Sequence, residues 1–228
     1  MMSNLSETSP RQSNVPLGTP THVSEPAFEF LLSEMLHWVE IDCYKDEQKG
    51  VITIDPPVNQ NMQPEEEEAM REEEKIMAAE RAAAKMERIG FDVGYRLVER
   101  LAQSKSLVPT GGGTKNANSP PTPAMIQLEA VKFLCKEFWS EVFRKQIDKL
   151  QTNHRGVFVL RDHEFKWLKR LPNDDEASRV AAIKLLAFPC GLIRGALDNL
   201  NIIAVVSCDF LADGKSMASC SFNIKVKS

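Results

Sequence analysis

The sequence lacks the features that identify several classes of protein. Its 28 basic residues do not outnumber its 32 acidic ones, which argues against a dedicated nucleic-acid-binding protein. Its five cysteines are odd in number and include no C-x-x-C pair, so we expect reduced thiols in a cytoplasmic protein rather than a disulfide framework. The N-terminus has no signal-peptide stretch, and we expect the most apolar runs, 181–193 and 202–208, to be too short or interrupted to span a bilayer.

Local motifs for catalysis, cofactors or metals are also missing. The four histidines, His22, His37, His154 and His163, form no H-E-x-x-H pattern, and none has a cysteine two to five residues away. The glycine triplet 111–113 is followed by a threonine and then a lysine, which is not the order of a phosphate-binding loop. We therefore expect no catalytic residue, no metal ligand and no cofactor, although a site assembled in space stays open.

What the chain does have is 43% hydrophobic residues, enough for a packed core, interrupted by three segments of a different composition. Residues 1–24 are rich in Ser, Thr and Pro and predict a disordered tail. Prolines break the chain at 55–64, and a glycine triplet with four prolines marks 104–124 as a flexible loop. We expect one domain, 25–228, with insertions near 55–64 and 104–124.

The apolar periodicity predicts helices in the first two thirds of that domain. The first helix, 28–41, has an apolar stripe at helical spacing. This stripe consists of Phe28, Leu31, Leu32, Met35, Leu36 and Val39. A second helix is expected from Pro64 to a glycine cap at Gly90, a third over 93–103 and a fourth over 125–150.

The remaining segments predict strands around one more helix. Residues 156–161 and 164–171 are expected to form a hairpin that turns near Asp162, and 201–210 with 217–227 a second one around Asp213 and Gly214. Between them a helix spans 174–200, with a break expected near Pro189. Cys208 and Cys220 are equidistant from Gly214, so we expect them opposite each other as reduced thiols. The fold class is α+β, with helices on a four-stranded antiparallel sheet made of two hairpins.

Two charged regions have two interpretations each. The run 65–74 contains seven Glu, and a solvated helix face is favoured over an acidic docking strip. Residues 128–170 hold ten basic and six acidic side chains. Here too a solvated surface is favoured over a face for an anionic membrane or an acidic partner.

Four stretches resemble a known family. They are AFEFLLSEML at 27–36, MERIGFDVGYRLVERL at 86–101, FLCKEFWSEVFRKQIDKLQTNHRG at 133–156 and LLAFPCGLIRGALDNL at 185–200. Together they are similar to the small subunits of the TRAPP vesicle-tethering complex, in the subunit 6 class. The resemblance implies a scaffold without enzymatic activity that pairs with a paralogous small subunit. It also implies a complex that acts as exchange factor for an early-secretory Rab GTPase, at endoplasmic reticulum and Golgi membranes.

The resemblance has limits that bear on membrane and partner contacts. A related paralogue carries an acylated cysteine after the helix equivalent to 93–103, but 103–127 contains no cysteine here, so no acyl anchor is expected. For the partner contact we expect the apolar stripe of the first helix, with Phe30 and Trp38 adding apolar surface outside it. The alternative is a carrier of lipids or small molecules. Its cavity would be lined by Phe133, Phe138, Trp139 and Phe143.

Overall fold

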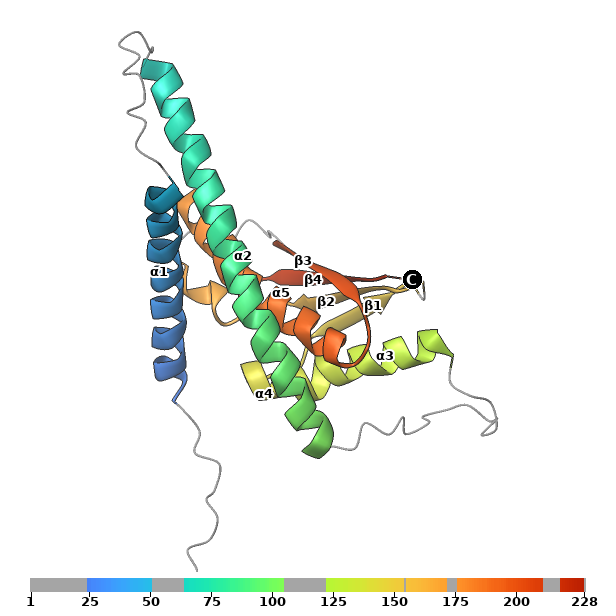
Figure 1. Cartoon of the computed structure of the whole chain (residues 1–228). Coiled ribbons are helices and arrows are strands. Elements are labelled where there is room, and N and C mark those ends of the chain that lie inside the picture. Colours follow the sequence, from blue (N-terminus) through green and yellow to red (C-terminus); the bar gives the residue numbers. More distant parts are fainter. Residues whose placement is uncertain are drawn as a thin grey trace, which may run out of the picture.

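The structure is a computed structural model that describes residues 24–50, 64–104, 122–153, 155–171, 176–210 and 218–227 (Figure 1). The elements in chain order are the helices α1 (Glu25–Gly50), α2 (Pro64–Ser104) and α3 (Pro123–Phe133), the π-helical turn η1 (Leu134–Phe138), helix α4 (Trp139–Phe143), strands β1 (Lys149–Thr152) and β2 (Val157–Asp162), the 3-10 turn η2 (Leu168–Arg170), helix α5 (Glu176–Asn199), and strands β3 (Ala204–Phe210) and β4 (Cys220–Val226). The α+β class is therefore confirmed. The tail 1–23 and most of both insertions lie outside the described residues.

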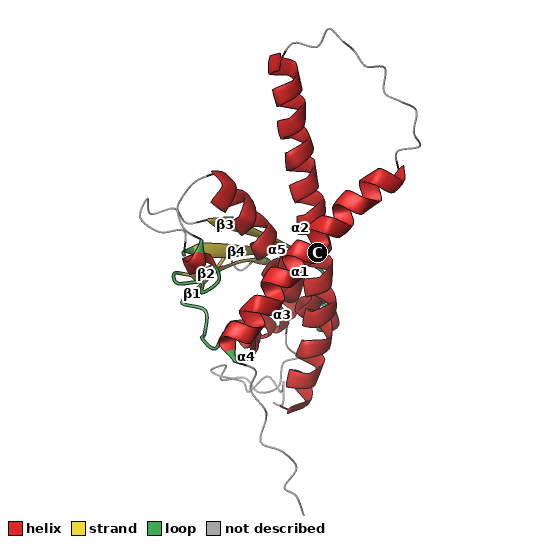
Figure 2. Ribbon diagram, turned by 90° about the vertical axis from the view of Figure 1, so that its left-hand side faces the viewer, coloured by secondary structure: helices red, strands yellow, loops and turns green. Residues whose placement is uncertain are grey.

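The four strands form one antiparallel sheet in the order β1-β2-β4-β3. Its inner face is apolar and buried, with Phe158 and Leu160 of β2 beside Phe222 and Ile224 of β4. The helices form layers on this one side, and Figure 2 shows the strands on one side of the molecule and α1 and α2 on the other, with α5 between them. An antiparallel sheet can leave its second face to the solvent, and this one does.

The first predicted hairpin is wrong, and the second is confirmed. Strand β2 pairs with β1, not with 164–171, which form a turn and η2. The predicted fourth helix ends at Phe143, because Arg144 adopts the left-handed conformation with φ of 57°. Gly156, at φ of 81°, then allows the turn from β1 into β2. Strands β3 and β4 pair as expected, although their connection, 211–217, lies outside the described residues.

Gly90 is not a helix end, since α2 runs without interruption from Pro64 to Ser104. A Cβ at Gly90 would lie 2.2 Å from the carbonyl oxygen of Phe188 in α5, and one at Gly94 would lie 2.1 Å from that of Leu192. The reverse holds for Gly191 and Gly195 of α5, whose Cβ atoms would lie 2.0 Å from carbonyl oxygens of α2. Each helix thus presents two glycines four residues apart, on one face, and the two backbones touch there.

Helix α5 also corrects two expectations about its own sequence. It continues through Pro189, where a break was predicted, because its burial against α2 and β3 outweighs the roughly 3 kcal/mol cost of an interior proline. Within the described residues, Ser178–Asn199 is the one helix with the length and apolar composition of a membrane span. The apolar run 181–193 taken alone was judged too short to span a bilayer, but the whole helix is long enough. Most of the helix is buried inside the structure, where a core helix has the same composition.

A buried carboxylate joins the sheet to the helix that ends at Phe143. Asp162, fully buried at the end of β2, accepts hydrogen bonds from Trp139 Nε1 at 3.2 Å, Lys145 Nζ at 2.7 Å and the backbone N–H of Glu164 at 3.1 Å. Lys145 also donates to Asp148 at 3.2 Å. Burial lowers the pKa of Lys145, but its hydrogen bonds to Asp162 and Asp148 raise that pKa overall. The charged pair is thus held by several partners, as a buried ion pair requires.

The glycine contact predicts that Gly191→Ala destabilises the protein. An added methyl normally stabilises a helix interior by about 1 kcal/mol, but here it meets a backbone oxygen that cannot move aside. We expect a loss of about 3 kcal/mol in the free energy of unfolding, measured by urea denaturation. Glu99→Ala, at an exposed position of α2, is the control and should change stability by less than about 0.5 kcal/mol. An unchanged or higher stability of Gly191→Ala would contradict the close helix contact.

The buried carboxylate predicts that Asp162→Ala lowers the free energy of unfolding by about 3 kcal/mol, because Trp139 and Lys145 lose their acceptor.

The pH dependence has a definite sign. Because the folded-state pKa of Lys145 is raised, its contribution is complete below the unfolded-state pKa of about 10.4 and is lost as the pH rises through the higher folded value. Urea denaturation from pH 7 to 11 should show this loss in the wild type and not in Lys145→Met. If the free energy of unfolding changed with pH in the same way in both proteins, the assigned contribution of Lys145 would be contradicted.

Candidate functional site

Helix α1 lies at the edge of the molecule and packs against α2 with one of its faces (Figure 1). On this inner face Leu32 and Val39 are buried in the core. Phe28, Met35 and Leu36 are half-buried and pack against the same core, and the Phe28 ring lies 5.7 Å from the Trp167 ring. The inner face therefore holds α1 on its own domain.

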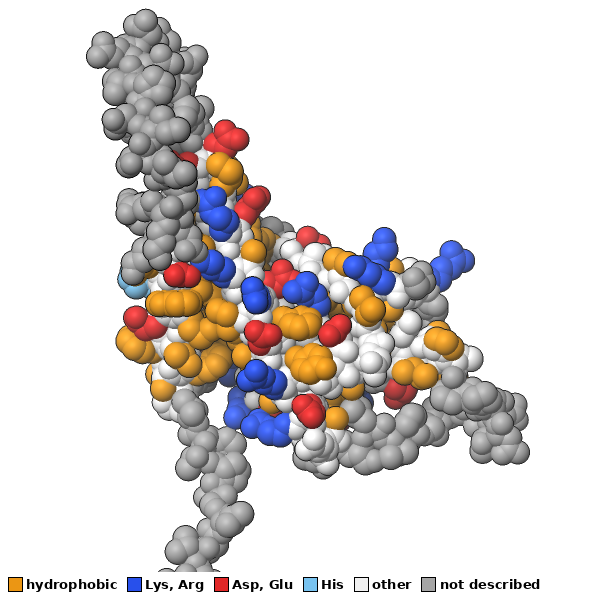
Figure 3. Space-filling model, in the orientation of Figure 1, with side chains coloured by type: hydrophobic (Ala, Val, Ile, Leu, Met, Phe, Trp, Pro, Cys, Tyr) orange, Lys and Arg blue, Asp and Glu red, His pale blue; other side chains and the backbone are white. Residues whose placement is uncertain are grey.

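The opposite face of α1 is also apolar, and it is exposed. Phe30 is 68% exposed, Leu31 54%, Trp38 59% and Ile41 39%. At about 100° per residue these four positions fall within one sector of the helix surface, which we call the outer α1 face. Figure 3 shows hydrophobic side chains gathered over this part of the molecule. Large exposed apolar side chains grouped in this way mark sites of protein–protein contact.

The structure thus divides the six residues that the sequence assigned to the partner contact. Leu31 lies on the outer α1 face, whereas Phe28, Leu32, Met35, Leu36 and Val39 face the domain. Phe30 and Trp38, which were expected to add surface outside the stripe, are the two most exposed residues of the outer face. Ile41 was missed, although it follows Trp38 at helical spacing. A charge placed at Leu32 would consequently test the core and not an interface.

Two ion pairs link α1 to its neighbours. Lys85 of α2 donates to Asp42 at 2.9 Å, and Lys184 of α5 donates to Glu40. Each is partly exposed, so each contributes little to stability. The orientation of α1 therefore depends mainly on its buried inner face.

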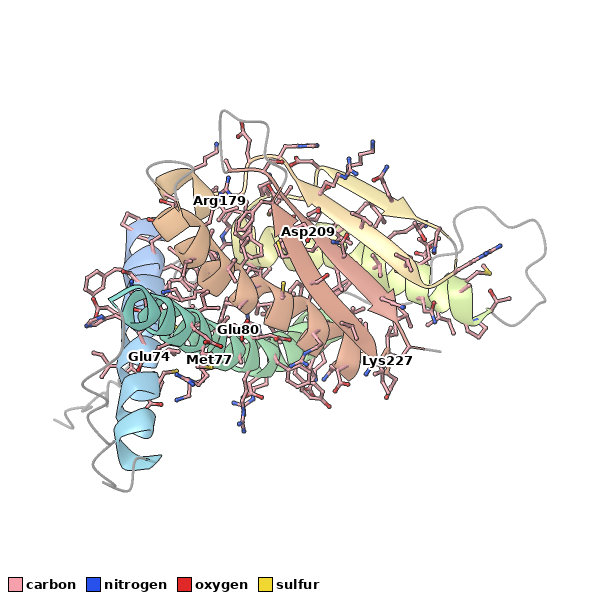
Figure 4. The ribbon with its side chains drawn as sticks, turned by 90° about the horizontal axis from the view of Figure 1, so that it is seen from above. Glu74, Met77, Glu80, Arg179, Asp209 and Lys227 are labelled. Carbon is pink, nitrogen blue, oxygen red and sulfur yellow. The ribbon has the colours of Figure 1, made fainter. Side chains whose placement is uncertain are left out.

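The upper part of α2 carries a second exposed group. Ile76 and Met77 are about half exposed, and the exposed carboxylates Glu74 and Glu80 lie next to them in the helix, as Figure 4 shows for Glu74, Met77 and Glu80. The side chains of 64–72, which hold most of the acidic run, lie outside the described residues. The exposed glutamates that are described fit a solvated helix face.

No described group of side chains has the arrangement of a metal centre. Among the described residues, no three His, Cys, Asp or Glu side chains are placed to hold a metal ion. His37 and His163 are exposed, and the backbone N–H of His163 donates to Asp148. His22, His154 and the glycine triplet 111–113 lie outside the described residues.

The cysteines are free thiols, and their register differs from the prediction. Cys208 lies opposite Phe222, and Cys220 opposite Phe210, so the two cysteines are diagonal neighbours and not a directly facing pair. Hydrogen bonds to the thiols of Cys190 and Cys220, together with burial, raise the pKa of Cys208. Burial raises the pKa of Cys135 to about 12. A thiol with a raised pKa is a poor nucleophile, so neither group has the chemistry of a catalytic cysteine.

The aromatic residues proposed to line a carrier cavity are part of the core. The Trp139 ring lies 4.2 Å from the Phe143 ring and 5.2 Å from the Phe222 ring, and Phe143 lies 5.1 Å from Phe165. Phe133 and Phe138 are buried in the same hydrophobic core. All four aromatic residues assigned to the carrier cavity are therefore core residues of the domain.

Comparisons with known proteins identify the family of the chain. Residues 28–227 match the family model described as transport protein particle (TRAPP) component. The trafficking protein particle complex subunit 6B of Homo sapiens is 37% identical over 147 residues, which cover 64% of this chain and 80% of that protein. Subunit 6A of Homo sapiens is 36% identical over 141 residues, covering 62% and 76%.

A solved structure of a related subunit is more distant. The trafficking protein particle complex subunit 3 from Naegleria fowleri, crystallised covalently bound to palmitic acid, is 12% identical with a TM-score of 0.47, and the alignment covers 66% of this chain and 82% of that one. At this distance its palmitate implies nothing for the present chain. The family match extends over residues 28–227, and the two human relatives are subunits 6B and 6A. The chain therefore belongs to the TRAPP component family, in its subunit 6 class.

Proposed function

We propose that the chain is a scaffold subunit of a TRAPP complex, without enzymatic activity, that binds a paralogous small subunit through its outer α1 face. The observation that carries this proposal is the exposure of Phe30, Leu31, Trp38 and Ile41 on one side of a helix whose other side is already buried. A helix that served only its own domain would need one apolar face. The second face costs solubility in an isolated chain and is explained by a partner that covers it.

The chemistry of the outer α1 face suits a stable contact. Tryptophan is among the residues that contribute most to binding energy when they are enclosed at the centre of an interface. Trp38 lies between Leu31 and Ile41 on this face, and Phe30 extends it toward the start of the helix. The surface contains few charges that binding would have to desolvate, with Glu34 between its apolar residues. Burial of this face accordingly supports a lasting heterodimer.

The proposed cellular role follows from the family. The relatives are named as subunits of a trafficking protein particle complex. In this role the chain supports Rab nucleotide exchange and transport between the endoplasmic reticulum and the Golgi only through assembly, by stabilising the subunit that it binds. It would act in the cytoplasm, peripheral to these membranes, and contact the Rab GTPase only within the assembled complex. It needs no nucleic acid, cofactor or metal for this function.

The test is a double variant, Phe30→Ala with Trp38→Ala, mixed with a purified paralogous small TRAPP subunit. We expect the dissociation constant, measured by isothermal titration calorimetry, to rise by at least about 30-fold, since truncation of one central aromatic residue costs about 2 kcal/mol or more. The fold should persist by circular dichroism, because both side chains are exposed.

The matched control is Ile183→Ala with Ile203→Ala, two side chains of similar exposure on α5 and just before β3. This control should bind the paralogue like the wild type. Unchanged binding by the α1 variant, or equal losses in the two double variants, would contradict the assignment of the interface to α1.

A further inference from the structure

The face of the sheet turned away from the helices has a composition of its own. Successive residues of a strand point to opposite sides, so the residues that alternate with the buried ones share this second face, which we call the outer sheet face. The pairing aligns Lys149, Arg161, Ser221 and Asp209 in one row across the four strands. A second row consists of Val157, Lys225 and Val205.

This face is cationic in a chain that is acidic as a whole. Its charged residues are Lys149, Arg161, Lys225 and Lys227, with Asp209 as the one carboxylate among the described strand residues of this face. Asp209 lies at the far end of β3 from Lys227, as Figure 4 shows, and it accepts a hydrogen bond from Asn223. The whole chain has a net charge of −4, so the positive charge here is a local feature.

Arg161 is the central group of this face. It is half-buried between Lys149 and Ser221, and its Nε is buried with no hydrogen-bond partner within the described structure. Buried donors in folded proteins are nearly always paired, so one without an acceptor needs an explanation. The fork of the guanidinium matches the two oxygens of a carboxylate. Because Nε itself is buried, a carboxylate from outside the chain would approach the part of this half-buried side chain that remains exposed.

Short apolar side chains lie between these charges. Ile203 is 61% exposed and Val205 50%, while Val157 and Val159 are half-buried. Branched side chains pack well against another protein surface, and none of the four is a Trp or Phe, the aromatic residues that anchor a protein in a membrane surface. The mixture of fixed arginine and small apolar residues therefore favours a protein partner over a lipid surface.

We propose that the outer sheet face docks an acidic segment of a neighbouring protein, with carboxylates at Arg161, Lys149 and Lys225 and apolar side chains over Val157 and Val205. The sheet and α1 lie apart, with α2 and α5 between them, so the two contacts do not compete (Figure 1). The proposal extends the proposed scaffold function: the chain would join two neighbours, a paralogue at α1 and an acidic protein at the sheet.

The test uses a fluorescein-labelled peptide of four Glu-Leu-Glu repeats, with Gln-Leu-Gln repeats as the uncharged control. Fluorescence anisotropy with the full chain at low ionic strength should show binding of the Glu peptide alone, weakening as salt is added. Lys149→Glu with Lys225→Glu should weaken binding by about 10-fold or more. Both lysines are exposed, so the fold should persist. Arg161→Gln should also weaken binding of the Glu peptide.

The control for net charge is Arg88→Glu with Arg96→Glu, at exposed positions of α2, a helix that is not part of the sheet. It changes the total charge equally and should bind the Glu peptide like the wild type. Equal losses in both double variants, no binding, or equal binding of the Gln peptide would overturn the proposal. So would face-dependent binding to vesicles of phosphatidylcholine with about one third phosphatidylserine in the absence of peptide binding. Paralogue binding should be unchanged in Lys149→Glu with Lys225→Glu, which separates this proposal from the assignment at α1.

Discussion

The backbone contact between α2 and α5 is the constraint on which the other parts of the structure depend. Four glycines, two from each helix, let carbonyl oxygens of one helix approach the Cα atoms of the other to distances that exclude any Cβ. Helix α5 packs in turn on β3, and α1 packs on α2. The depth of this contact therefore sets the distance between the sheet and α1, and with it the positions of both outer surfaces.

This arrangement explains how a chain of modest size can expose the two surfaces for which we propose partners. The helices cover one face of the sheet and leave the other to solvent, and α1, the last layer, covers α2 while its own outer side stays free. A scaffold needs separate contacts that do not disturb its core, and here the core residues Leu32 and Val39 and the surface residues Phe30 and Trp38 lie on opposite sides of one helix. The proposed partner contact would accordingly be independent of the packing that folds the domain.

Much of the fold could be predicted from local patterns, and the failures share a cause. The first helix, the β3–β4 hairpin and the α+β class follow from periodicity and turn residues, which act over a few positions. Gly90 was read as a helix end because an interior glycine and a capping glycine look alike until the facing glycines of α5 are known. Pro189 was read as a break because its compensation is tertiary. Strand β1 is short and polar, and only its pairing with β2 identifies it.

The candidate site was predictable in part for the same reason. Helical spacing indicated an apolar stripe on the first helix, and Phe30 and Trp38 indicated apolar surface beyond it. Which side faces the domain depends on where α2 lies, and this is a property of the folded chain. The charged row on the outer sheet face could not be seen at all without the register that aligns Lys149 with Arg161.

The central claim, that α1 joins the domain by one face and a partner by the other, is tested most directly by hydrogen exchange with mass spectrometry. The chain would be compared alone and in complex with a paralogous small TRAPP subunit. The account predicts slower amide exchange across Phe30–Ile41 in the complex, with little change in β1 and β2, because a covered helix opens less often. Protection confined to the sheet, with α1 exchanging at its free rate, would contradict it.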